Sequence, residues 1–405
     1  MRSRLLVLTF DPLTDAMAGP AIRAWHLAQV LADHFIVTLA STVGASRRHD
    51  SLRVCSVADE TGGMAALVDE ADVVFAPTSV VRRHPEIASS SVPLVVDMYI
   101  PTHLENLERG RRSDEDYRRA VSHQVSVIND DLARGDFFLC ASERQRDFWL
   151  GSLSQAGRVN PATYDADPTL RRLIDVVPFG LPPDPPLPAG PVLRRHFPAI
   201  GAGDPVVVWG GGVYDWFDPV SLVRAVDRVR NRIPDVRLVF LGMSNPNPDI
   251  AEMSRAVELR KVSDELGLTG TTVFFNDEWV PYQDWGSYLL DADVAVSMHL
   301  DNVETRFSFR TRILDYLWAR RPMILTGGDS LGDLIAARGL GFAVAPGDVD
   351  AIVDALMHLL VEGLPRADFG PTVAQFQWPV VAQPLTAWLA GARHAADRPA
   401  LSYGA

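Results

Sequence analysis

Short apolar segments alternate with longer amphipathic ones along the first half of the chain. The apolar segments are brief enough to be strands buried on both faces, and they lie at 5–9, 35–40, 73–76, 94–96, 137–140 and 175–177. Between them, residues 21–33 and 143–150 carry apolar side chains at helical spacing, and a charged stretch at 101–134 predicts a long helix broken near 112–114. This alternation predicts a doubly wound parallel sheet.

The alternation stops at a proline-rich stretch and then starts again. Residues 178–188 contain too many prolines for a helix or an interior strand, which predicts a stiff connection between domains. Helices are predicted at 220–232 and 250–266. Strands are predicted at 205–209, 237–241, 273–275, 294–298 and 322–326. The restart predicts two similar α/β domains.

Composition narrows the class of protein. The chain has 405 residues, of which 47% are apolar and 22% charged, as in ordinary soluble proteins with two or three domains. A net charge of −13 argues against binding nucleic acid or an anionic membrane by bulk electrostatics. Lys261 is the one lysine, so arginine must hold any bound phosphate. Cys55 and Cys140 lie in apolar contexts and predict neither a disulfide framework nor a metal cluster.

No targeting or membrane segment is recognisable. The chain runs from its first residues directly into the strand at 5–9, which is too short for a signal-peptide core. No apolar stretch approaches the length needed to span a bilayer. We therefore expect a soluble, cytoplasmic protein.

The segment from 292 to 348 carries the most chemical information. Its first strand leads into a polar loop and a helix that opens at 307–312 and carries Asp315 within two turns. Its second strand ends in Gly-Gly-Asp-Ser (327–330), just before another helix. Two helix N-termini placed side by side after parallel strands form an anion site, and a carboxylate behind them suits ribose hydroxyls. A nucleotide diphosphate fits this description.

The same segment resembles the donor-site region of the retaining GT-B glycosyltransferases of family 4. Leu-Asp-Tyr-Leu-Trp-Ala (314–319) stands where that family has Leu-Glu-Ala-Met-Ala, and 341–348 resembles its Gly-x-x-Val-x-Pro-Gly-Asp turn. Val-Val-Pro-Phe-Gly-Leu (176–181) resembles its Val-x-Pro-Asn-Gly-Val run, with Phe179 in place of Asn. The resemblance covers nearly the whole chain.

The resemblance implies a GT-B fold with the active site in an interdomain cleft. We expect an N-terminal Rossmann-like acceptor domain at 1–183, a C-terminal Rossmann-like donor domain at 184–376, and a final helical tail at 377–405 that crosses back to the first domain. The protein would move a sugar from a nucleotide diphosphate sugar to a small-molecule or glycan acceptor, with retention. No metal and no cofactor is implied.

Two loops are candidates for donor binding. Gly211, Gly212 and Tyr214 follow the strand at 205–209, where consecutive glycines allow close backbone approach, although a tight turn without a ligand is the alternative. The family's Arg and Lys, which hold the pyrophosphate, are missing there. Trp279 and Val280 follow the strand at 273–275, in the loop that meets the nucleobase in the family, although the tryptophan suits the core equally well.

Arginines around the helix start at 307–312 are candidates to bind the pyrophosphate in place of the family's missing Arg and Lys. If the helix is continuous, Arg306 and Arg310 share a face while Arg312 points elsewhere, so we expect Arg310 to be the first phosphate ligand and Arg306 to assist. A solvated helix face with salt bridges is the alternative. The remaining donor candidates belong to the same helix start, and they are Ser308, Phe309 and Thr311.

Two carboxylates resemble the family's pair of glutamates. Glu304 stands for the one that contacts the donor sugar, and Asp315 for the one that contacts the ribose. The spacing is longer by three residues than in the family, so the loop must bulge. A charge that merely favours the helix dipole is the alternative for Asp315. Glu304 and Arg310, with His103 of the first domain, are the predicted catalytic residues.

Candidates for the acceptor follow strands of the first domain. Gly19, Pro20 and Arg23 open a helix where the family has a glycine-rich turn that faces the reaction centre. A second group follows the strand at 94–96, where the family often places a histidine, and comprises Asp97, Tyr99 and His103. The alternatives are an ordinary capped helix for the first group and a structural histidine for the second.

Other functions remain open. The absence of the family's Arg and Lys is also consistent with an atypical transferase, such as a pseudo-glycosyltransferase or one with a natural-product or thiol acceptor. A nucleotide-sugar-binding protein without turnover is a further alternative. The nucleobase, the sugar and the acceptor are not specified by the sequence.

Overall fold

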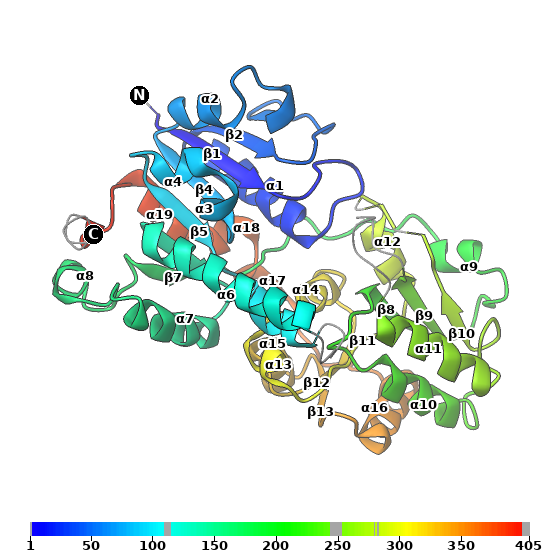
Figure 1. Ribbon diagram of the computed structural model, residues 1–405. Helices are drawn as coiled ribbons and strands as arrows, with labels where there is room; N and C mark the ends of the chain where they lie inside the picture. Colours follow the sequence, from blue (N-terminus) through cyan, green and yellow to red (C-terminus); the bar gives the residue numbers. More distant parts are fainter. Residues whose placement is uncertain (1, 109–114, 244–252, 279, 282, 399–405) are drawn as a thin grey trace. The chain divides into compact units, whose positions relative to one another are not determined.

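The computed structural model describes residues 2–108, 115–243, 253–278, 280–281 and 283–398. By contacts, the chain divides into two compact units (Figure 1). The first comprises Met1–His103, Arg112–Gly180 and Phe376–Ala405, and the second comprises Leu104–Arg111 and Leu181–Gln375. Each unit is described by itself.

The first unit is built on a seven-stranded parallel sheet of order β3-β2-β1-β4-β5-β6-β7. Its strands are β1 (Arg4–Thr9), β2 (Ile36–Ser41), β3 (Arg53–Ser56), β4 (Val73–Pro77), β5 (Leu94–Asp97), β6 (Phe137–Cys140) and β7 (Ile174–Val176). Its helices are α1 (Gly19–Ala32), the 3₁₀ turn η1 (Val57–Asp59), α2 (Gly63–Asp69), α3 (Val80–Arg83), α4 (Pro85–Ser89), α6 (Glu115–Arg134), α7 (Glu143–Gln155), α8 (Pro161–Ala166), α18 (Trp378–Val381) and α19 (Gln383–Ala390). The short helix α5 (Thr102–Glu108) begins in this unit, and from Leu104 onward it belongs to the second.

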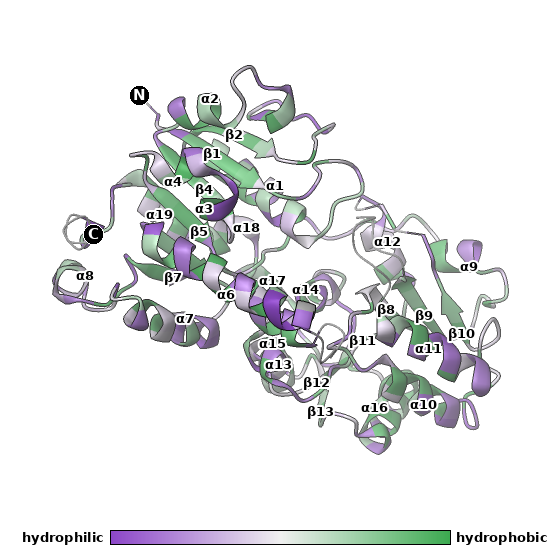
Figure 2. Ribbon diagram, in the orientation of Figure 1, coloured by the Kyte–Doolittle hydropathy of each residue, from purple (hydrophilic) through white to green (hydrophobic). Residues whose placement is uncertain are grey.

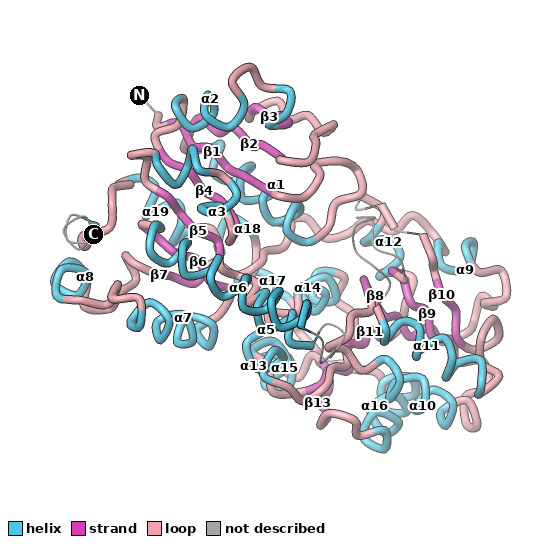
Figure 3. The backbone as a smooth tube through the Cα atoms, viewed as in Figure 1, coloured by secondary structure: helices cyan, strands magenta, loops and turns pink. Residues whose placement is uncertain are grey.

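The second unit repeats the design with a six-stranded parallel sheet of order β10-β9-β8-β11-β12-β13 (Figure 3). Its strands are β8 (Val206–Gly212), β9 (Arg237–Gly242), β10 (Val273–Phe275), β11 (Val294–Ser297), β12 (Met323–Thr326) and β13 (Gly341–Val344). Its helices are α9 (Val192–His196), α10 (Pro219–Val229), α11 (Ser254–Glu265), α12 (Trp285–Leu290), α13 (Val303–Phe307), α14 (Thr311–Trp318), α15 (Ser330–Ala337), α16 (Val349–Val361) and α17 (Gly370–Gln375).

The interior strands form because their residues are apolar on both faces. The strands of both sheets are mostly green in the hydropathy view (Figure 2), and central strands such as β5 and β11 are buried along their whole length. Side-chain caps start some of the helices: Ser142 accepts from the amide of Gln145 at the start of α7, and Asp218 caps α10. The prediction of two doubly wound α/β domains is confirmed.

Several boundaries differ from the sequence-based prediction. The edge strand β3 and the short helix α12 were not predicted, and β13 begins in a segment that was read as a turn. The predicted helix at 250–266 is α11, from Ser254 to Glu265, and residues 250–252 lie outside the described ones. The predicted break near 112–114 in the long charged helix also lies outside the described residues.

The proline-rich stretch belongs to the second unit from Leu181 onward. The backbone oxygen of Asp184 accepts from the Trp318 indole at 2.7 Å, and that of Leu187 accepts from the Ser287 hydroxyl at 3.0 Å. The chain's final segment packs on the first unit, where Trp388 stacks on Phe137. Among the described residues, none of the helices combines the length and apolarity that a membrane span requires.

Candidate functional site

The second sheet has a topological switch point between β8 and β11. The chain moves outward from β8 to β9 and β10, then returns to β11 and moves the other way to β12 and β13. In open parallel sheets, ligands bind at the carboxyl ends of the strands beside such a point. Most of the predicted donor residues lie at the end of β8 or between β11 and the first two turns of α14, whereas Val280 follows β10.

The glycine loop at the end of β8 is held in place by neighbouring backbone and by a buried tyrosine. The amide of Gly210 donates to the Tyr316 hydroxyl at 2.8 Å, and that hydroxyl donates to the backbone oxygen of Val296 on β11 at 2.8 Å. Gly211 has φ of +80°, which only glycine adopts at low cost. A Cβ on Gly242 would lie 3.0 Å from the carbonyl carbon of Gly211, so the ends of β8 and β9 approach closely.

The helix predicted to open at 307–312 is broken in the structure. α13 ends at Phe307, and Ser308 and Arg310 have extended backbone before α14 begins at Thr311. The expectation that Arg306 and Arg310 share one helix face is therefore wrong, because they lie on separate elements. Arg306 is exposed, and its guanidinium lies 5.9 Å from the Phe307 ring.

Because of this break, Arg310 folds back onto Glu304. Both guanidinium ends donate to the carboxylate, at 2.9 Å from Nη1 and 2.5 Å from Nη2. Glu304 is fully buried and Arg310 is 6% exposed. Such a bidentate pair neutralises both charges in place. Two of the three residues predicted to be catalytic are thus brought together, with each as the partner of the other; their proposed contacts with a donor stay predictions.

Arg312 has a different environment. It lies at the start of α14, against the rings of Trp209 and Phe217, whose centroids are 4.9 and 4.1 Å from the guanidinium carbon and which contact each other edge-on. Its Nη2 donates to the backbone oxygen of Gly212 at 2.6 Å. Burial lowers the pKa of Arg312 to about 10, so it remains charged near neutral pH.

Asp315 lies one turn further along α14. Burial raises the pKa of its carboxyl to about 7, against the opposing effects of a hydrogen bond from Trp285 and the charge of Arg312. A carboxyl group with this pKa is divided between its charged and neutral forms near neutral pH. Either form can accept a hydrogen bond from a hydroxyl group.

The remaining donor candidates have varied positions. Ser308 is buried and donates to the backbone oxygen of Thr305, Phe309 lies between α13 and α14, and Thr311 is the first residue of α14. Tyr214 stacks on Trp216 with ring centroids 4.9 Å apart. Val280 is buried in the loop after β10. Trp279 lies outside the described residues.

Buried polar atoms without hydrogen-bond partners gather at this edge of the sheet. Within the described part of the chain, they include Oγ of Ser297, both ring nitrogens of His299, Nδ2 of Asn302, Nε of Arg310, Nη1 of Arg312 and Oδ2 of Asp329. Unsatisfied polar groups are costly in a fold, so these atoms are candidates for contacts with a ligand.

Several members of this group were missed as site residues. His299 is 1% exposed, and its Nε2 lies 3.5 Å from Asp329 Oδ2. Asp329 also caps α15 by accepting from the amide of Gly332 at 2.6 Å. Ser297 ends β11, and Asn302 caps α13. Their positions at or within a few residues of the ends of the predicted strands 294–298 and 322–326 were the signal that could have identified them.

In the first unit, the predicted acceptor residues adjoin the ends of β1 and β5. Arg23 on α1 is 1% exposed and donates to both carboxylate oxygens of Asp97, at 2.6 and 3.0 Å. It also donates to the backbone oxygens of Val177 and Pro178, and its guanidinium lies 4.6 Å from the Tyr99 ring. These bonds give Arg23 a role in holding strand ends together.

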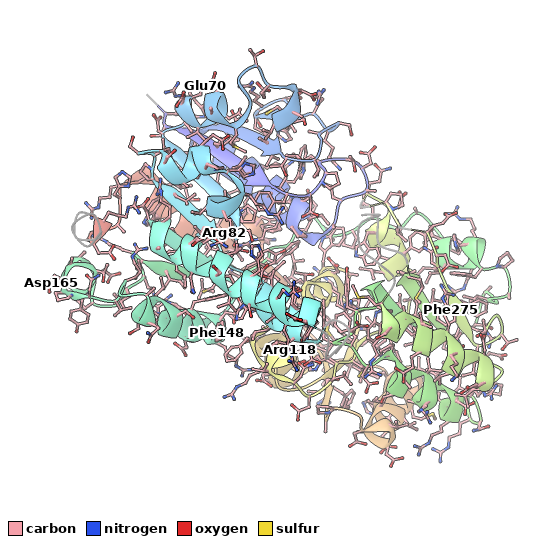
Figure 4. The ribbon with its side chains drawn as sticks, viewed as in Figure 1. Glu70, Arg82, Arg118, Phe148, Asp165 and Phe275 are labelled. Carbon is pink, nitrogen blue, oxygen red and sulfur yellow. The ribbon has the colours of Figure 1, made fainter. Side chains whose placement is uncertain are left out.

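The other first-unit candidates lie around this cluster. Gly19 and Pro20 form the start of α1, and a Cβ on Gly19 would lie 3.9 Å from the Tyr99 hydroxyl. His103 stacks on Phe148 of α7, which is labelled in Figure 4, with ring centroids 5.7 Å apart. Burial lowers the pKa of His103, and its Nδ1 has no partner among the described residues.

The residues described here hold no cluster of three or more His, Cys, Asp or Glu side chains arranged to bind a metal ion. Both cysteines are free and buried.

Comparisons with known proteins point to the part of the chain that contains this candidate site. Residues 204–362 match the family model described as "Glycosyl transferases group 1". Curated protein sequences give no match. Among solved structures, the chain resembles sucrose-phosphate synthase from Thermosynechococcus elongatus, with a TM-score of 0.70 and 14% identity over 96% of this chain and 99% of that one.

Two further structures resemble the chain over its length. The Anabaena protein HepE, solved in complex with UDP and glucose, gives a TM-score of 0.66 at 14% identity over 96% of this chain and 100% of that one. The trehalose-6-phosphate synthase OtsA gives 0.66 at 11% identity, over 97% and 100%. At these identities the likeness establishes the fold, two Rossmann-like domains as in GT-B glycosyltransferases. The unit that holds the candidate donor site thus carries a glycosyl transferases group 1 domain, which together with this fold supports a glycosyltransferase.

Proposed function

We propose that the protein transfers a sugar from a nucleotide diphosphate sugar to a small-molecule or glycan acceptor, with retention of anomeric configuration. The observation that carries the proposal is the group of unpartnered buried polar atoms at the switch point of the second sheet, which includes arginine nitrogens. It lies inside the residues that match the glycosyl transferases group 1 model. HepE, solved with UDP and with UDP-glucose, is a relative in fold whose ligands belong to this class.

Each part of the donor has a candidate partner. The diphosphate lies at the start of α14, where arginine side chains and a helix N-terminus favour negative charge. Asp315 accepts from the ribose hydroxyls, and the loop that contains Val280 faces the nucleobase. The sugar contacts the region of Glu304. On the first unit, His103 and the start of α1 at Gly19 contact the acceptor.

The chemistry follows from these roles. In a retaining transfer, the departing phosphate takes the proton of the acceptor hydroxyl on the same face as the new bond, so no protein base is required. The protein's contribution is to stabilise the diphosphate charge as it develops and to orient the two substrates. The reaction as proposed uses no metal and no cofactor.

The first test is binding of UDP, GDP, ADP and dTDP measured by titration calorimetry. Tight, selective binding of one nucleotide supports the donor site and names the donor class. The matching nucleotide sugars are then incubated with candidate acceptors, and the anomeric configuration of the product is read by NMR. Inverted product contradicts the retaining mechanism. Binding without any transfer or donor hydrolysis contradicts the assignment as an enzyme, and no binding of any nucleotide contradicts the donor site itself.

A further inference from the structure

Arg312 is a buried cation whose hydrogen bonds are incomplete. It is 8% exposed, and its Nη2 donates to the backbone oxygen of Gly212. Its Nη1 is shielded from solvent and has no partner in the described part of the chain. The rings of Trp209 and Phe217 lie against the guanidinium and stabilise its charge only weakly compared with a carboxylate.

No carboxylate within the described ranges lies at ion-pair distance from Arg312. The neighbouring Asp315 acts on it only at longer range. Burying an arginine charge without a counter-ion costs several kcal/mol, so the arrangement is unfavourable unless an anion completes it. Arg310, two residues away, has its charge already matched by the bidentate bonds to Glu304. A bound anion is therefore stabilised more by Arg312, whose charge has no counter-ion, than by Arg310.

The backbone around Arg312 suits a phosphate group. α14 has no side-chain cap, whereas the neighbouring α13 and α15 are capped by Asn302 and Asp329. The carboxylate of Asp329 at the start of α15 disfavours an anion there, which leaves α14 as the open helix start. The glycine run at 210–212, which ends β8 and lacks side chains, approaches the same guanidinium, since a Cβ on Gly211 would lie 3.9 Å from Nη2.

We propose that Arg312 binds the diphosphate of the nucleotide donor, together with the start of α14 and the glycine loop at 210–212. This inference rests on the proposed function and assigns the phosphate contact within it. Arg310 then acts as the fixed partner of Glu304. A planar guanidinium with a free nitrogen matches the oxygens of a diphosphate, which carries about two negative charges. Arg312 thereby takes the place of the family's Arg and Lys, which are missing after β8.

The experiment compares nucleoside diphosphates with their nucleosides. Titration calorimetry is performed with UDP, GDP, ADP and dTDP, with the four nucleosides, and with inorganic pyrophosphate, on wild type, Arg312→Met and Arg312→Lys. Methionine retains most of the apolar volume against Trp209 and Phe217, and lysine retains the charge without the planar fork. Arg224→Met, at an exposed position on α10, is the matched control for loss of one positive charge. Thermal unfolding of the ligand-free variants reports whether the fold is intact.

We expect Arg312→Met to weaken diphosphate binding about 10–100-fold, the loss typical of one charge-assisted hydrogen bond, with nucleoside affinity unchanged. Arg312→Lys should lie between this variant and wild type, and Arg224→Met should match wild type. If wild type binds a nucleoside diphosphate and both Arg312 variants bind it equally well, the assignment of Arg312 is wrong while the donor site stands. If wild type binds neither the nucleoside diphosphates nor pyrophosphate, the proposed function fails and this assignment fails with it.

Discussion

The buried pair of Glu304 and Arg310 gives a direct test of how the segment between β11 and α14 is held. We consider Glu304→Leu, Arg310→Met and the double variant. Each single change leaves one charge buried without its partner: after Glu304→Leu, the Arg310 guanidinium retains a long contact with Thr305 Oγ1 at 3.4 Å and the Phe217 ring at 5.0 Å.

The expected loss of stability follows from the burial of this pair. Removing one partner of a fully buried, bidentate pair typically costs about 3–5 kcal/mol. For a domain of about 150–250 residues, that corresponds to a fall in Tm of roughly 6–20 °C. The double variant leaves neither charge behind and should recover most of the loss, because apolar side chains often replace a buried pair at little cost.

Differential scanning calorimetry measures the effect, since it can separate the transitions of the two units. The matched control is the exposed pair of Arg228 on α10 and Asp350 on α16, whose side chains are 50% and 79% exposed. Arg228→Met and Asp350→Leu should each cost less than about 1 kcal/mol. A double-mutant cycle gives the coupling within each pair. If Glu304→Leu and Arg310→Met each cost no more than the control changes, with no coupling, the buried pair does not hold this segment.

Three further predictions concern neighbouring groups. Tyr316→Phe should destabilise the second unit by about 2–3 kcal/mol in urea unfolding, because the amide of Gly210 and the carbonyl of Val296 both lose a buried partner; an unchanged midpoint would contradict those bonds. Burial raises the folded-state pKa of Asp315 to about 7, above its unfolded value of 3.8, so its contribution to wild-type stability should be lost as the pH rises from about 4 to about 7. Asp315→Asn should reduce the fall in Tm over this range, and equal pH profiles of the variant and wild type would refute the shift. His103→Gln should lower the rate of transfer and leave nucleotide affinity unchanged, since His103 belongs to the first unit; a fully active variant would exclude a role for this ring.

Most of the fold could be predicted because the central strands carry an unambiguous pattern. β8, β9 and β11 are apolar on both faces, as strands inside a parallel sheet must be. The edge strand β3, with the sequence Arg-Val-Cys-Ser, has an exposed first residue and only two buried ones. Such a short edge strand has no pattern that distinguishes it from a loop. It forms because β2 offers a register for it from Thr38 to Ser41.

The candidate site could be located from the sequence, but its internal pairing could not. Polar residues that follow parallel strands meet at one edge, and this placed Glu304 and Asp315 near the glycine loop. The three arginines were interpreted on a continuous helix, which made Arg310 the phosphate ligand. The break at 308–310 reverses that interpretation, because it turns Arg310 back onto Glu304, six residues earlier. Extended backbone at Ser308 and Arg310 has no strong sequence signal, since neither residue is glycine or proline.

Arg23 of the first unit and Arg312 of the second are both buried near strand ends, but they differ in whether a carboxylate balances the charge. In the first unit, every nitrogen of the Arg23 guanidinium already donates to a protein oxygen, and Asp97 balances its charge. In the second unit, Arg312 retains an unpartnered nitrogen and has no paired carboxylate among the described residues. An arginine charge that a carboxylate already neutralises attracts an anion weakly, whereas a buried arginine charge without a counter-ion attracts it strongly. The diphosphate is therefore expected beside Arg312 on the second unit and not beside Arg23 on the first.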